Sequence, residues 1–80
     1  MAFKYRPAVL EELARHGVVP GEDTPPELVH DFVSDLYRWQ IRALKRRMLA
    51  GEIAKPDYAK AVEVLRRGYP LLSLPVQYWT

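Results

Sequence analysis

His30 and Ser34 lie four residues apart, and each is followed by an aspartate, Asp31 and Asp35. On a helix this spacing places an imidazole and a hydroxyl on the same face, the two groups that nucleophilic catalysis pairs. A working triad also needs a third group that orients the base, together with an oxyanion hole. The sequence shows neither a nucleophile turn nor such donors. We therefore interpret these four residues as solvated helix surface and expect that the protein is not an enzyme.

Glu27 and His30 have the Glu-x-x-His spacing that supplies two ligands to carboxylate-bridged di-iron sites. Such a site needs a second copy of the motif and two further glutamates, and this chain has one copy. Glu27 also has a structural role in the predicted capping box that begins at Thr24. His16 stands beside Gly17, where it can complement the negative end of a helix. We expect no metal site, no cofactor and no evident small-molecule substrate, because no glycine-rich phosphate loop is present either.

A set of basic residues points to a different chemistry. Four of them lie at i, i+4, i+7 and i+8 of one predicted helix, with a fifth alongside, and Trp39 is next to them. The five are Arg38, Arg42, Lys45, Arg46 and Arg47. A basic stripe with an aromatic side chain can neutralise phosphates and stack on bases. The alternative is a solvated helix face, with acids near the helix start and bases near its end as the helix dipole favours. Both interpretations stay open.

Composition limits the class of protein. The chain has 80 residues, enough for one domain over 1–80, and 49% of them are hydrophobic, which argues against disorder. It contains no cysteine, which suits a reducing compartment, and no apolar run approaches the ~20 residues that span a bilayer. We expect a cytoplasmic protein with no membrane contact. The absence of asparagine and the presence of seven prolines are typical of a thermophile, and a GC-rich genome would bias the composition in the same way.

Charge is distributed unevenly between the two halves of the chain. The formal net charge is +2, yet residues 1–37 hold three basic and seven acidic residues. Residues 38–80 hold nine basic and three acidic ones. Such asymmetry is typical of a chain that binds an acidic partner, nucleic acid or a complementary surface.

Prolines and glycines mark the elements. Three segments open with Pro7, Pro25 and Pro56 and close with a glycine, and proline suits a first helical turn as glycine suits a helix end. The pattern predicts three helices, at about 7–16, 25–50 and 56–67, and hence an all-α fold with a long central helix. Residues 69–80 carry no charge and seven large apolar side chains. We expect this C-terminal segment to be ordered and to cover part of the core.

The central helix is long for so small a protein. Twenty-six helical residues span ~39 Å, whereas a compact chain of this length is roughly 30 Å across. Helices 1 and 3 could lie end to end along it as a second layer. Its apolar side covers an arc of more than ~200°, about twice what one covering layer requires. The C-terminal segment or a second copy of the chain could cover the rest.

These observations favour a protein–protein interaction module that associates with itself through the central helix, as a homodimer, or binds a partner protein there. The candidate interface residues are Phe32, Leu36, Tyr37, Trp39, Ile41, Leu44 and Met48. The alternative function is a small nucleic-acid-binding protein that uses the basic residues of the same helix.

Overall fold

The computed structural model describes residues 2–80 and has an all-α fold, as predicted. Three α-helices form: α1 (Pro7–Arg15), α2 (Pro26–Leu49) and α3 (Lys55–Arg67). Two short 3-10 turns follow them, η1 (Pro70–Ser73) and η2 (Val76–Tyr78), and residues 2–80 contain no strand. Within this part of the chain, no helix is both long enough and apolar enough to cross a membrane.

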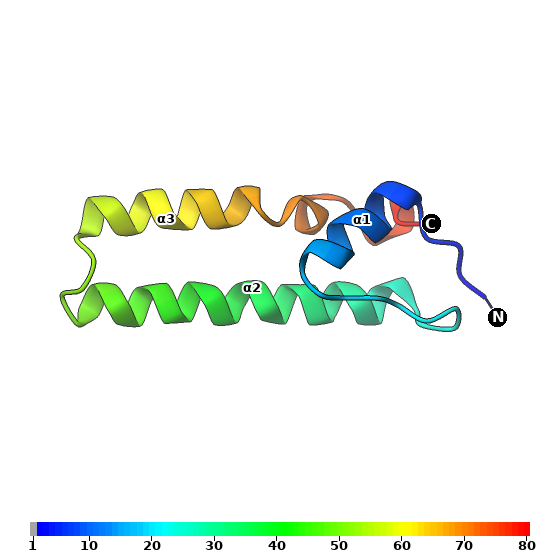
Figure 1. Cartoon of the computed structure of the whole chain (residues 1–80), viewed down its shortest axis with the longest axis horizontal. Coiled ribbons are helices and arrows are strands. Elements are labelled where there is room, and N and C mark those ends of the chain that lie inside the picture. The colour runs from blue at the N-terminus through cyan, green and yellow to red at the C-terminus, as the bar shows by residue number, and fades with distance from the viewer. Residues whose placement is uncertain (1) are drawn as a thin grey trace.

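The helices form two layers, with α2 as one of them along its whole length (Figure 1). α3 returns antiparallel to the second half of α2, while α1 and the C-terminal turns lie over its first half, near both termini. The molecule measures 49 × 18 × 16 Å, and its radius of gyration is 14.9 Å, against ~12 Å for a compact chain of this length. The prediction that α2 outruns a compact globule is therefore correct.

Prolines and glycines set most helix ends as predicted. A proline occupies the first or second position of each α-helix, where an N–H has no intrahelical acceptor to lose. Gly17 and Gly51 adopt φ values of +72° and +81°, the left-handed conformation that ends a helix. Gly68 differs, because its φ of −76° keeps the chain right-handed as it passes from α3 into η1.

The predicted capping box at the start of α2 does not form. Pro26 disfavours helical geometry in the residue before it, and Pro25 is accordingly extended, with ψ of 138°. The helix therefore begins at Pro26 rather than Pro25, and its N-cap makes no side-chain hydrogen bond. Thr24 instead closes the preceding turn, where its Oγ1 accepts a hydrogen bond from the Gly21 N–H at 2.9 Å.

The hydrophobic core lies at one end of the molecule. Its buried members come from α1, the first half of α2 and the C-terminal segment: Val9, Leu13, Val29, Val33, Tyr69, Leu71 and Trp79. Trp79 is fully buried, and its indole N–H donates to the Leu74 carbonyl at 3.1 Å. The Arg6 N–H donates to the Trp79 carbonyl at 2.9 Å, which ties the two ends of the chain together. The expected ordered C-terminal segment is confirmed.

The second layer contains more than the two predicted helices. α1 and α3 follow one another along α2 as predicted (Figure 1), but α1 packs mainly on η1, while η1 and η2 pack on α2. The apolar C-terminal segment thus shares the second layer with α1. It supplies Leu71 and Trp79, which fill space that the short α1 could not fill alone.

At the other end of the molecule, residues 34–68 include no buried side chain. The buried residues of α2 all lie in its first eight positions, and α3 has none. There α2 and α3 meet through half-buried side chains such as Ile41, Leu44 and Leu65. In this part of the hairpin, α2 and α3 are therefore each covered only by the other helix.

Candidate interaction surface

The seven predicted interface residues of α2 divide between two faces. Five are half-buried: Leu36, Tyr37, Ile41, Leu44 and Met48. Leu36 and Tyr37 pack against the core, and the Tyr37 ring meets the Tyr69 ring edge-on at 5.3 Å between centroids. Phe32 and Trp39 are 53% and 63% exposed. The wide apolar arc is therefore real, but its inner part already has neighbours from the same chain.

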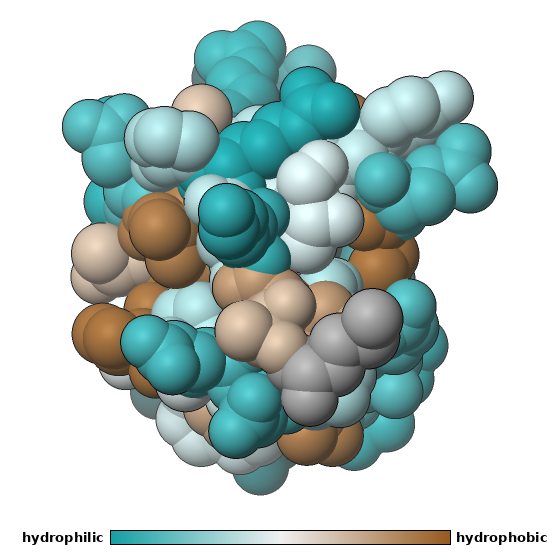
Figure 2. Space-filling view, turned by 90° about the vertical axis from the view of Figure 1, so that its right-hand side faces the viewer, coloured by the Kyte–Doolittle hydropathy of each residue, from teal (hydrophilic) through white to brown (hydrophobic). Residues whose placement is uncertain are grey.

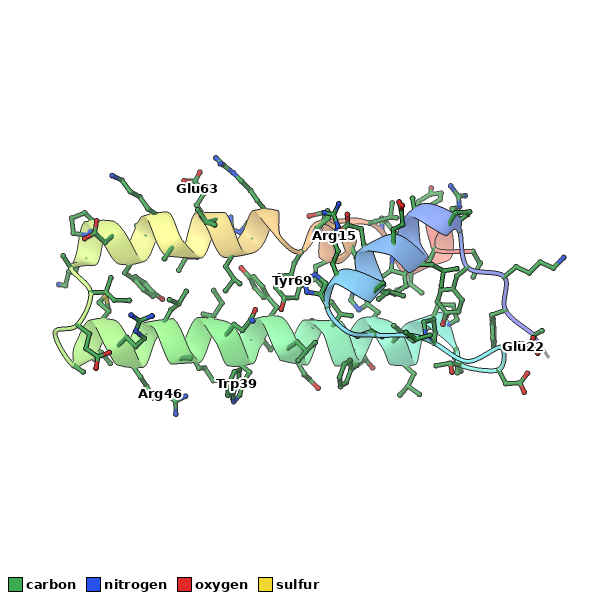
Figure 3. All side chains as sticks on the ribbon, in the orientation of Figure 1. Arg15, Glu22, Trp39, Arg46, Glu63 and Tyr69 are labelled. Atoms are coloured by element: carbon green, nitrogen blue, oxygen red, sulfur yellow. The ribbon has the colours of Figure 1, made fainter. Side chains whose placement is uncertain are left out.

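The exposed edge of the arc and three charged residues next to it form a regular stripe, which we call the outer stripe. Its members repeat at alternating intervals of four and three residues, and all are exposed: Leu28, Phe32, Asp35, Trp39, Arg42, Arg46 and Leu49. Leu28 and Leu49 are 61% and 72% exposed. In Figure 3, Trp39 and Arg46 project from the side of α2 that faces away from α3. Intervals of four and three are those of a helix that packs along a second helix.

The large apolar members of the outer stripe lie in shallow hollows. Leu28 and Phe32 line a hollow of about 490 Å³ together with Val18, Val19 and Pro20 of the α1–α2 loop. Trp39 and Leu49 line a second hollow of about 370 Å³. A view from the end that holds both termini shows apolar side chains reaching the surface between polar ones (Figure 2). Side chains of another helix could fit into these hollows.

The charges of the outer stripe change sign along its length. Asp35 lies in the first half, with the exposed Asp31 beside it, and Arg42 and Arg46 lie in the second half, with Lys45 beside them. Asp35 approaches Arg38 at 3.7 Å, an exposed pair that leaves its carboxylate accessible. Within residues 2–80, the salt bridges include none that involves Arg42, Lys45 or Arg46.

The predicted basic set is only partly one surface. Arg38, Arg42, Lys45 and Arg46 are exposed on or next to the outer stripe, as expected. Arg47 lies apart from them, because it lines a separate groove between α2 and α3 and pairs with Glu52 at 3.4 Å. One hundred degrees of rotation per residue carries Arg47 away from Arg46. The cluster beside Trp39 therefore consists of three bases, Arg42, Lys45 and Arg46.

The groove between α2 and α3 is a second uncovered surface. It has a volume of about 470 Å³ and is lined by Gln40, Ala43, Leu44, Arg47, Ala61, Val64 and Leu65. Val64, on α3, is 66% exposed. Val64 was not among the predicted interface residues, all of which lie on the central helix.

The histidines take part in packing. The His30 ring lies 5.6 Å from the Trp79 ring, so His30 is a neighbour of the core rather than a fully solvated residue. His16 stacks on Tyr69 at 4.2 Å, and its Nε2 is 2.9 Å from the Gly68 carbonyl. Within residues 2–80, no group of three His, Cys, Asp or Glu side chains is placed to hold a metal ion.

Comparison with known proteins adds no further assignment: the chain matches no protein family, no curated protein and no solved structure. Its function is therefore argued from its own surface.

Proposed function

We propose that this protein is a self-association module whose outer stripe on α2 binds a second copy of the chain. The observation that carries the proposal is the row of four large, more than half-exposed apolar side chains along one helix face, Leu28, Phe32, Trp39 and Leu49. Large exposed apolar side chains gathered on one face are typical of interaction sites, and charged residues of the same face stand between these four. Aromatic side chains such as Trp39 are also the residues that contribute most to binding at interfaces.

The position of the core supports the same proposal. The second half of α2 and the whole of α3 bury no side chain completely, so this hairpin gains little stability from its own packing. A chain of 80 residues without disulfides is stabilised by sharing surface with another subunit. α2 is covered on one side by the second layer of its own chain, and a second copy bound to the outer stripe would cover its other side.

Light scattering on a size-exclusion peak tests the proposal. The chain has a mass of 9.3 kDa, and we expect a peak of twice that mass at about 100 μM, where a complex with a micromolar Kd is formed. Trp39→Lys should shift the peak to the monomer mass because it replaces the indole with a cation beside Arg42 and Arg46. Val64→Lys is the matched control, since Val64 is equally exposed but lies in the α2–α3 groove. Dissociation by Val64→Lys but not by Trp39→Lys would place the interface in the groove.

A second candidate function rests on one specific observation. Trp39 stands 63% exposed beside Arg42, Lys45 and Arg46. An indole next to free cations can stack on a base while the cations neutralise phosphates. Asp31 and Asp35 continue along the same helix and would repel a long phosphate backbone, which ranks this candidate below self-association. A parent protein that is monomeric at every concentration and binds a labelled single-stranded oligonucleotide only at low salt would favour it.

A further inference from the structure

We propose that two copies pair their outer stripes antiparallel and in one register, in which Asp35 of each copy meets Arg46 of the other. This inference rests on the proposed self-association and specifies its geometry. Three features of the stripe carry it: the symmetry of its spacing, the change of charge sign along it, and the match of side chains in a single register.

The spacing of the stripe is the same when it is read in either direction. From Phe32 to Leu49 the intervals alternate three, four, three, four and three residues, and the reversed sequence of intervals is identical. A second α2 turned end over end can therefore lay its stripe along the first over this whole length. Two-fold symmetry then makes every contact occur twice, as in the commonest closed oligomers.

The charges oppose a parallel arrangement. In parallel pairing, Asp35 would face Asp35, and Arg42 and Arg46 would each face their own copies. Like charges placed opposite one another at an interface are destabilising. Antiparallel pairing instead sets the acidic first half of each stripe against the basic second half of the other, so the face is complementary to itself.

Only two antiparallel registers keep most of the stripe in contact with its copy. In the proposed register the pairs are Phe32 with Leu49, Asp35 with Arg46, and Trp39 with Arg42. These pairs join an apolar side chain to an apolar one, an acid to a base, and an indole to a guanidinium. Arginine above an indole ring is the most favourable kind of cation–π contact.

The other register is shifted by seven residues, and its pairs are poorly matched. It joins Leu28 with Arg46, Phe32 with Arg42, and Asp35 with Trp39. One of its layers would bury a guanidinium against an aliphatic side chain without an acid, and another would keep only the weaker cation–π contact of a guanidinium with a phenyl ring. The third would place a carboxylate against an indole. Burial of an unpaired charge is costly, so the first register is favoured.

Charge reversal with rescue tests the pairing. Because Asp35 and Arg46 form two pairs per dimer, D35R and R46D should each raise the Kd at least tenfold, as loss and reversal of an interfacial charge pair do. The double variant D35R/R46D carries the pair in reversed order and should restore the Kd to within about threefold of the parent. Within one helix the two positions are eleven residues apart, too far to contact each other. E63R is the control, since Glu63 points away from α2 in Figure 3, and it should leave the Kd unchanged.

Disulfide trapping gives an independent readout, since the chain has no cysteine of its own. Mixing D35C with R46C under mild oxidation should yield the mixed cross-linked dimer, because these positions face each other. Either variant alone should cross-link poorly, since like positions are then separated by ~16 Å along the helix axis, beyond disulfide reach.

The outcomes separate this inference from the proposed function. A parent that is dimeric, with no rescue in D35R/R46D and cross-linking of D35C to itself, would overturn the antiparallel register while leaving self-association intact. A parent that stays monomeric would overturn both. Rescue together with mixed cross-linking supports both.

Discussion

Tyr69, which is buried, and Tyr5, which is half-buried against the core, each donate one hydrogen bond that depends on a neutral phenol. The Tyr5 hydroxyl donates to the Thr24 carbonyl, and the Tyr69 hydroxyl donates to Gln40 Oε1, both at 2.6 Å. Burial raises the pKa of both phenols above their ordinary value of 10.0, and the carboxylate of Glu27 adds to the effect at Tyr5. Both phenols are therefore neutral at physiological pH.

These raised pKa values predict a loss of stability at alkaline pH. As the pH rises past 10, the tyrosines of the unfolded chain ionise first, so the unfolded state binds fewer protons than the folded state and the free energy of unfolding falls. At lower pH both states are protonated and the contribution is fully present. Urea unfolding of the parent should therefore show a lower midpoint at about pH 11 than at about pH 8.

The variant Y5F/Y69F is the control for this prediction. It should be less stable than the parent at about pH 8, by about 1 kcal/mol for each lost hydrogen bond, and should lose less stability on going to about pH 11. An identical alkaline loss in the parent and in the double variant would show that these phenols are not responsible.

Among the elements, the C-terminal segment contributes more to stability than its lack of regular α-helix implies. It supplies Tyr69, Leu71 and Trp79, three of the seven buried residues of the core. Full burial of one large apolar side chain contributes ~1.5–3 kcal/mol, whereas a small domain is stable by only ~5–15 kcal/mol. Truncation after Gly68 should therefore abolish cooperative unfolding.

A pair of adjacent residues gives a milder test of the same element. Trp79 is fully buried and Tyr78 is 47% exposed. Trp79→Ala should lower the free energy of unfolding by ~3–5 kcal/mol, while Tyr78→Ala should change it by less than ~1 kcal/mol. Equal urea midpoints for the two variants would contradict the assigned role of this segment.

The elements themselves could be predicted from sequence because their signals are local. Proline within the first turn and glycine at the end placed all three helices to within one residue, and the uncharged run after Gly68 indicated an ordered segment. The start of α2 could not be read from the capping pattern alone, because Pro26 acts on the geometry of Pro25. That local conflict displaced Thr24 from its expected role.

The candidate surface could be predicted only in part, since helical periodicity shows which residues share a face but not what covers it. Leu36 and Leu44 are as apolar as Phe32 and Trp39. Leu36 nevertheless packs against the core and Leu44 faces α3, whereas Phe32 and Trp39 are exposed. The contacts of η1 with both α1 and α2 are long-range contacts that no spacing reveals. Leu49 was missed for the opposite reason: its position in the four–three repeat becomes apparent only once the inner residues are set aside.

At the scale of the whole molecule, the core is concentrated at one end of an elongated body 49 Å long. The end near both termini closes on itself through Arg6, Trp79 and the buried C-terminal segment. At the far end, α2 and α3 pack on each other without a buried residue. We propose that this shape is half of an assembly, in which the outer stripe of α2 is covered by a second α2.

The dependence of thermal unfolding on protein concentration tests that claim most directly, because it measures whether the fold is stabilised by another copy. If the outer stripe binds a second copy, a hundredfold increase in concentration above the Kd adds ~2.7 kcal/mol of stability per mole of dimer, and the Tm should rise by several degrees. Trp39→Lys should have a Tm that is independent of concentration. A parent Tm that stays constant from about 5 μM to about 500 μM, with the monomer mass throughout, would contradict the account.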